Sequence, residues 1–310
     1  MNNEFITQII NDFLETKPET ITVIGYGSAV KKQNRDKNII KKQIDIIIGV
    51  KDPKKWHKEN KLRNPNDYTF MGYNVLTKLP TSITNYGTNI NYLAYLTHKN
   101  FQFKIGVIKN TDLINDLNNW ENGYMAGRMQ KSVKVIKGSK EIRDAIKRNR
   151  ENALRVSLLL LDTNNLTIEG LHQKICSLSY DGDIRMRFKM ENPNKVIDIA
   201  KGSKEELTEI YTSVNNGYYT VDKNDNITIN YDKIISTYED FPKNLKEKIH
   251  EPKSTKKEDL LRVREEINKY IHKNNLKTSI AQPLKGIATN GISKSFTYAV
   301  NKRRKHNIYK

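Results

Sequence analysis

This chain has very little of several features that mark secreted or membrane-spanning proteins. It contains a single cysteine, Cys176, among its 310 residues, which excludes an internal disulfide and a cysteine-rich zinc site. No window approaches the roughly 18 uninterrupted apolar residues that a membrane-spanning helix needs. Residues 1–19 lack both the basic start and apolar stretch of a signal peptide and the arginine-rich character of a mitochondrial presequence. These absences predict a cytoplasmic protein without a transmembrane segment.

Acidic residues are also scarce, and they are missing mainly from one end. The sequence has 54 Lys and Arg against 35 Asp and Glu, a formal net charge of +19. Residues 251–310 hold fifteen basic and five acidic residues, and no acidic residue follows Ile267. Such an excess is typical of proteins that bind nucleic acid, an anionic membrane or phosphorylated substrates. Because the excess is localised, it predicts a basic surface formed by the C-terminal segment.

The apolar pattern predicts an α+β protein. We expect helices over residues 4–16, 53–61, 111–120, 140–161, 166–178 and 259–273. We expect strands over residues 21–26, 44–50, 92–97, 101–108, 182–188, 196–200, 218–222 and 226–231. The length predicts two domains with a basic extension: residues 1–135, a helical winged-helix-like unit over residues 136–245, and a basic helical segment over residues 246–310.

Two features of the first predicted strands indicate phosphate chemistry. Gly25-Tyr-Gly-Ser28 ends a strand, where Gly-Ser lets the backbone approach an anion closely, although such turns are also common without a ligand. Asp45 is an isolated carboxylate in the run Ile44–Val50. It must be paired, bind a metal, or face solvent at the end of the strand.

A Gly-Ser turn followed by an acid-bearing strand resembles the DNA polymerase β-type nucleotidyltransferases, in which the turn holds nucleotide phosphates and strand carboxylates hold Mg²⁺. Further motifs narrow the resemblance. They are Tyr26-Gly-Ser-Ala29, Ile44–Val50 with Asp52-Pro53 and Trp56-His57, Asn64-Pro65, Tyr68, Lys104–Val107, Tyr124–Arg128 with Lys131, Leu178–Tyr180, Gly182–Met186, Ala281-Gln282, Lys285-Gly286, Thr289 and Lys294-Ser295. In order and rough spacing they resemble the mitochondrial-type phosphatidate cytidylyltransferases, the CDP-diacylglycerol synthases of the translocator assembly and maintenance type.

The resemblance implies a fold and a reaction. The fold is an α/β nucleotidyltransferase core like that of DNA polymerase β, followed by the winged-helix-like domain. The reaction joins CTP to phosphatidic acid and releases pyrophosphate, with Mg²⁺ or another divalent cation, in phospholipid (phosphatidylglycerol and cardiolipin) biosynthesis. Known members face the mitochondrial matrix.

The resemblance also implies roles for individual residues. Tyr26, Gly27 and Ser28 are expected to hold the triphosphate, and Asp45 to hold the metal. Lys104 and Arg185 are expected to neutralise the reacting phosphates, with Arg128 and Lys195 as further phosphate ligands.

The second metal ligand is open, because Ile47 stands where nucleotidyltransferases usually have a second acid. Asp183 and Asp52 are candidates, or a single metal is bound. Asp183 could instead orient Lys104, or form a structural ion pair with Arg185, since residues two apart on a strand face the same side.

The last residues predict a basic amphipathic helix. Ile292, Phe296 and Val300 share a helical face, and Lys302–Lys305 is a basic run. This pattern is typical of a segment that docks on an anionic membrane, which would make the protein peripherally membrane-associated. A solvated helix or a nucleic-acid-binding tail is the alternative. Two rival functions stay open: a nucleotidyltransferase acting on RNA or protein, and a non-catalytic basic nucleic-acid-binding protein, which we place third.

Overall fold

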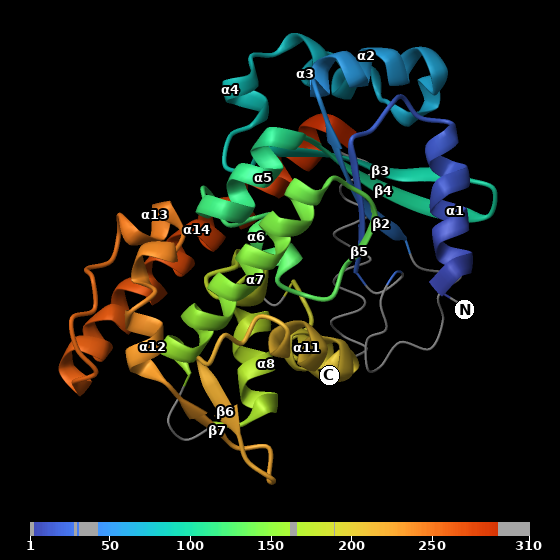
Figure 1. Cartoon of the computed structure of the whole chain (residues 1–310). Coiled ribbons are helices and arrows are strands. Elements are labelled where there is room, and N and C mark those ends of the chain that lie inside the picture. The colour runs from blue at the N-terminus through green and yellow to red at the C-terminus, as the bar shows by residue number, and fades with distance from the viewer. Residues whose placement is uncertain (1–2, 28–29, 31–42, 162–165, 189, 291–310) are drawn as a thin grey trace.

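A five-stranded mixed sheet forms the centre of the N-terminal half of the chain (Figure 1). The computed structural model describes residues 3–27, 30, 43–161, 166–188 and 190–290. The strand order is β3–β4–β2–β1–β5; β2 and β4 are parallel, and the other neighbours are antiparallel. The strands are β1 (Thr22–Tyr26), β2 (Ile44–Val50), β3 (Ile90–His98), β4 (Phe101–Lys109) and β5 (Lys134–Lys137).

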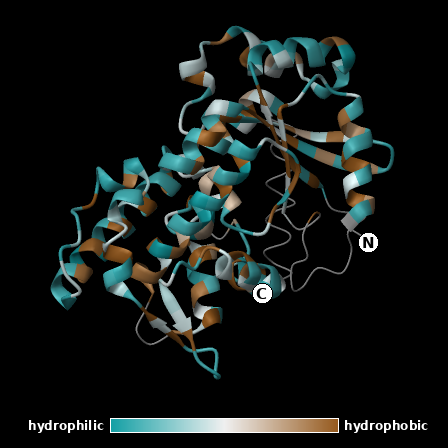
Figure 2. Ribbon diagram, in the orientation of Figure 1, coloured by the Kyte–Doolittle hydropathy of each residue, from teal (hydrophilic) through white to brown (hydrophobic). Residues whose placement is uncertain are grey.

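Both faces of this sheet are buried, which explains the continuous isoleucines of β2. One face packs on α1 (Asn3–Glu15), α2 (Pro53–Arg63) and α3 (Phe70–Lys78), with Phe13 stacked on Phe103. The other face packs on α5 (Asn110–Asn119), α6 (Ala126–Met129) and the start of α7 (Lys140–Leu160). The strands are the most hydrophobic part of this half (Figure 2). Asp45 is the one residue of β2 that is not fully buried.

A second apolar core lies among the helices that follow the sheet. It contains the apolar end of α7 and reaches from Trp120 to Ile271 through buried tyrosines such as Tyr211. The elements around it are α8 (Ile168–Ser177), α9 (Ile184–Arg187), α10 (Lys195–Gly202), α11 (Lys204–Thr212), β6 (Tyr219–Val221), β7 (Ile227–Ile229), α12 (Tyr231–Ile235), α13 (Lys243–Lys246) and α14 (Lys257–Asn290). The predicted hairpin over residues 218–231 is confirmed by the β6–β7 pair.

The end of α14 lies along the sheet edge formed by β3. The Asn290 side chain accepts a hydrogen bond from the Ala94 amide (2.9 Å) and donates one to the Tyr92 carbonyl (3.1 Å). Lys285 donates to the Thr88 carbonyl at 2.6 Å. Side chains of α14 therefore occupy positions that a sixth strand would use.

The sequence prediction is wrong at two segments. Residues 182–188 form a turn at Gly182 and the one-turn helix α9, and residues 196–200 lie in α10. Asp183 caps α9 by accepting from the Arg185 amide, and a helix allows Ile199 and Ala200 to be buried together while Ile197 is exposed. Short apolar runs fit either period, so local pattern does not separate the two.

The remaining predicted helices and strands are confirmed within the described residues, and α2 begins as expected with Asp52 accepting from the amides of Lys54 and Lys55. The elements that were not predicted include α3, α4 (Thr81–Thr84), α6, β5, α11, α12 and α13, and α14 continues to Asn290, beyond the predicted end of its helix at residue 273. Ser28 and the predicted helix beyond Gly291 lie outside the described residues. In the described part of the chain no helix has the length and apolar character to cross a bilayer.

Candidate active site

Two neighbouring strand ends bring Asp45 and Lys104 together. β2 and β4 run parallel with these two residues in register, so their side chains leave the same face side by side. The Lys104 Nζ lies 4.0 Å from the Asp45 Oδ1, and the two side chains are 20% and 28% exposed. This distance is longer than a hydrogen bond, and the exposure leaves the pair accessible to a ligand.

The turn after β1 passes directly over the Asp45 carboxylate. Tyr26 is the antiparallel partner of Asp45, and Gly27 follows with a φ of +78°. A Cβ on residue 27 would lie 3.2 Å from the Asp45 Oδ2. Gly27 is therefore required both for the left-handed backbone and for the closeness of the turn to the carboxylate.

An aromatic ring lies against the cation of this pair. The Lys104 Nζ lies 4.3 Å from the centre of the Tyr92 ring, a cation–π distance. Burial, together with Tyr92 and Asp45, raises the pKa of Tyr26, so its hydroxyl stays protonated. The ring of Tyr92 therefore holds Lys104 beside the Asp45 carboxylate through a cation–π contact, which leaves the lysine charged.

Arg128 extends the positive charge from this pair toward the helical half. Its guanidinium lies 3.5 Å from the centre of the Tyr124 ring and donates from Nη1 to the Tyr124 carbonyl at 2.9 Å. Its Nε is buried and has no hydrogen-bond partner among the residues that the structure describes. A buried guanidinium donor left without an acceptor is costly, and the Nε atoms of Arg155 and Arg264 are in the same state.

Further cations lie within electrostatic reach of Arg128. Arg185 acts directly on it, and Lys131 is affected by both Arg128 and Lys195. Burial, with the charges of Arg128 and Lys195 adding to it, lowers the pKa of Lys131 to about 8. Four cations from α6, the turn after it, α9 and α10 are therefore linked electrostatically through Arg128 and Lys131.

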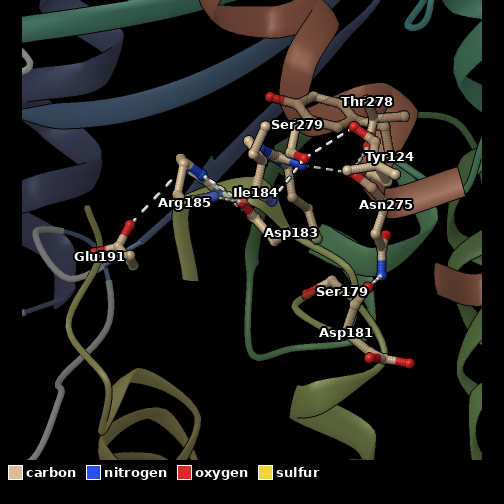
Figure 3. Close-up of polar contacts among 12 residues, drawn as sticks. Tyr124, Ser179, Asp181, Asp183, Ile184, Arg185, Glu191, Asn275, Thr278 and Ser279 are labelled. Carbon is tan, nitrogen blue, oxygen red and sulfur yellow. Dashed lines mark hydrogen bonds and ion pairs between the residues drawn. The ribbon is translucent and has the colours of Figure 1, made fainter. Parts of the chain in front are cut away.

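Asp183 and Arg185 form a tight ion pair rather than an open one (Figure 3). The Asp183 carboxylate accepts from the Arg185 Nε at 3.0 Å and from its Nη2 at 2.5 Å, and only 4% of this side chain is exposed. Arg185 also lies 3.8 Å from the Glu191 carboxylate. The structural ion pair that the sequence left open is formed, although on a helix cap and not on a strand.

A comparison with known proteins now identifies the chain's relatives. A family model described as "Phosphatidate cytidylyltransferase, mitochondrial" matches residues 6–305. The chain belongs to this family.

Individual relatives agree with this result. The protein of that name from Schizosaccharomyces pombe is 36% identical over 208 residues, covering 67% of this chain and 52% of that protein. The Homo sapiens protein of that name is 36% identical over 206 residues, covering 64% of this chain and 44% of that protein. The Danio rerio protein is 27% identical over 325 residues, covering 97% and 94%. Several matches thus span only about half the length of the relative.

A cytidylyltransferase implies a divalent cation, and the donor set can be tested for it. No three His, Cys, Asp or Glu side chains gather into a metal cage within the described ranges. Mg²⁺, however, is commonly held by one or two carboxylates with substrate phosphates and water completing its shell. The partly exposed Asp45 fits that pattern.

The other two carboxylates proposed as metal ligands have different surroundings. The oxygens of Asp183 are engaged by Arg185, and Asp52 caps α2. A metal-binding role for Asp183 stays a prediction.

Two residues of the site were missed at the level of sequence. Tyr92 and Tyr124 lie between the Asp45–Lys104 pair and Arg128. Lys104 and Tyr92 both interact electrostatically with Tyr124, and Arg128 interacts in the same way with Tyr124, Tyr92 and Tyr26. Tyr124 lies four residues before Arg128, a spacing that predicts contact on a helical turn. Tyr92 carried no local signal, since its partner Lys104 lies on another strand.

Proposed function

We propose that this chain transfers a cytidylyl group from CTP to phosphatidic acid, forming CDP-diacylglycerol and pyrophosphate. The observation that carries the proposal is the accessible Asp45–Lys104 pair beneath the Gly27 turn, next to the unpartnered Arg128 Nε. Family membership supports the identity of the two substrates.

The reaction joins two anions, and this determines what the site must supply. An oxygen of the phosphatidate phosphate attacks the α-phosphorus of CTP, the bond to the β-phosphate oxygen breaks, and pyrophosphate leaves with that electron pair. A phosphomonoester has a second pKa near 6, so the attacking oxygen is largely ionised at pH 7 and no strong base is needed. The barrier is charge repulsion, which fixed cations lower.

The residues divide this work by position. Lys104 and Arg128 neutralise the reacting phosphates, and Arg185, Lys131 and Lys195 extend the positive region. The backbone at Tyr26, Gly27 and Ser28 binds the triphosphate. Asp45 would hold Mg²⁺, which supplies charge neutralisation at the phosphates when bound.

We further propose that the protein acts at an anionic membrane surface, with the basic segment 246–310 contributing to the attachment. Its lipid substrate resides in a bilayer, and each Lys or Arg near an anionic surface adds about 1 kcal/mol of attraction. The proposal divides the chain into a nucleotidyltransferase domain (1–135), a winged-helix-like domain (136–245) and a basic segment (246–310). It places the protein in the cytoplasm, where its product would supply cardiolipin and phosphatidylglycerol synthesis.

A single assay tests the proposal. The purified chain is incubated with cytidine-labelled CTP, Mg²⁺ and phosphatidate vesicles, and the organic phase is examined for a labelled lipid. We expect a labelled lipid whose formation requires both Mg²⁺ and phosphatidate. Label appearing in added RNA and not in lipid would contradict the proposal and favour the RNA-directed alternative.

A further inference from the structure

Large apolar side chains are exposed along one face of α14 and on the segment beside it. Ile280, Leu284 and Ile287 are 42%, 60% and 43% exposed, and their spacing of four and three residues places them on one helical face. Phe70, Ile83 and Tyr86, from the segment between β2 and β3, are 87%, 56% and 63% exposed. We call these six residues the apolar strip.

Direct contacts join the two segments that carry the strip. The Lys277 Nζ lies 5.6 Å from the centre of the Tyr86 ring, and a Cβ on Gly87 would collide with the Ala281 Cβ. At the other end of the helix, Thr69 donates to the Thr289 carbonyl at 3.4 Å. The strip therefore follows the last four turns of α14, with residues 83–87 at one end and residues 69–72 at the other.

Charge identifies what this surface can bind. Residues 68–111 contain no Asp or Glu, and neither does any residue after Ile267. Exposed Lys273 and Lys277 lie on the same face of α14 as the apolar side chains. Apolar side chains within an acid-free, lysine-bearing surface match a membrane with anionic headgroups, whereas a second copy of the same surface would be repelled.

We propose that the apolar strip inserts into the interface of an anionic bilayer and holds the candidate active site at the membrane. A different face of α14 binds β3 through Asn290 and contacts the Gly182–Ile184 turn, where Ser279 accepts from the Ile184 amide at 3.0 Å. One helix thus faces the bilayer on one side and both halves of the site on the other. This inference uses the proposed function only to explain why the protein would bind a membrane. Binding of the strip to lipid is measured without catalysis.

The first test reads insertion by fluorescence. The native Trp56 and Trp120 are each 3% exposed, so a new tryptophan dominates any change on lipid binding. Leu284→Trp is compared with Leu261→Trp, a position on the same helix outside the strip that is 43% exposed. With phosphatidylcholine vesicles containing phosphatidate, we expect a blue shift at residue 284 and quenching by acyl-brominated lipid, and neither at residue 261. Equal responses at the two positions would overturn the proposal.

The second test removes the strip. Ile83→Ser combined with Leu284→Ser is compared with Val221→Ser combined with Leu261→Ser, all at partly exposed positions. Each lost apolar contact with lipid is expected to weaken vesicle flotation by about tenfold. We expect the strip variant to lose flotation while the control floats as the unaltered protein does. Unchanged flotation of the strip variant, or a dimer in vesicle-free solution that only the strip substitutions dissociate, would overturn it.

A third measurement separates this inference from the proposed function. With a dispersed short-chain phosphatidate, the strip variant should retain the turnover of the unaltered protein, whereas with vesicles it should lose it. Absence of turnover with every phosphatidate would contradict the proposed function, and the flotation result would still decide the strip. Equal turnover of both proteins on vesicles would contradict the strip.

Discussion

Two acid–base pairs lie at the candidate site, and they differ in almost every physical respect. Asp45 and Lys104 stand 4.0 Å apart with 28% and 20% of their side chains exposed. Asp183 and Arg185 are joined by several hydrogen bonds, and the Asp183 side chain is only 4% exposed. An open pair can exchange its partner for a ligand, whereas a buried and saturated pair fixes the geometry of its surroundings. An aspartate beside a cation therefore predicts a reactive group at Asp45 and a positioning group at Asp183.

The largest effect should come from the acid of the open pair. Asp45→Asn keeps the shape of the side chain but removes the charge that a metal needs, so we expect turnover to fall by roughly a thousandfold or more. Thermal unfolding should change little, because the substitution keeps the size and shape of a side chain that is 28% exposed. The lipid-extraction assay and circular dichroism measure the two quantities. Turnover close to that of the unaltered protein would show that the metal is held elsewhere.

The base of the open pair should have the next largest effect. Lys104→Gln removes a cation that faces the reacting phosphates, and we expect kcat to fall by about a hundredfold. Lys104→Arg should restore part of this loss, because it returns the charge with a different shape. A loss confined to KM, with kcat unchanged, would assign Lys104 to substrate binding alone.

Substitution in the Asp183–Arg185 pair should lower the stability of the protein more than it lowers turnover. Asp183→Asn still caps α9 but leaves Arg185 with only the more distant Glu191 carboxylate, and we expect the free energy of unfolding to fall by about 2 kcal/mol. The figure is smaller than for a fully buried pair because 30% of the Arg185 side chain is exposed. Urea denaturation of this variant beside Asp45→Asn gives a direct contrast. A stable but inactive Asp183→Asn protein would favour the metal-ligand role.

A third ionic group, centred on a histidine, should give the smallest effect. His250 lies between Glu266 (Nδ1 to Oε2, 2.9 Å) and Asp259 (Nε2 to Oδ1, 3.0 Å). Burial opposes its charge, but the hydrogen bonds to the two acids raise the pKa of His250 overall. The stabilisation is therefore complete below the unfolded pKa of about 6.5 and is lost as pH rises through the higher folded value.

The acids set the lower limit of this window. The hydrogen bond from His250 lowers the pKa of Asp259 to about 2, so its contribution is present above its unfolded pKa of about 4 and is lost as pH falls toward 2. We expect the melting temperature of the His250→Gln variant to depend less on pH between pH 6 and pH 8 than that of the unaltered protein. An identical pH profile in both proteins would contradict this assignment.

Sequence predicted best what local chemistry determines. The isoleucine run of β2 and the Asp52 cap of α2 follow from neighbours in the chain, whereas the sequence left three possibilities for Asp45. The sequence did not predict the contacts of Lys104. Lys104 meets Asp45 because their strands pair, and it meets Tyr92 because β3 pairs with β4 on its other side.

The helix cap at Asp183 shows why a local pattern can mislead. Alternation predicted a strand there, whereas the short segment is held by α14, about ninety residues later in the chain. The family resemblance included this block but carried no information about its secondary structure.

The contact between Asn290 and β3 has a consequence for how the isolated protein behaves. β3 is an edge strand of mostly apolar residues, and such edges recruit strands from other molecules when their amides and carbonyls are left open. The side chains of α14 close this edge at Ala94, Tyr92 and Thr88. Removing α14 would therefore create a template for intermolecular β-pairing, and a shortened chain intended to isolate the sheet should retain residues up to Asn290 to stay free of aggregates.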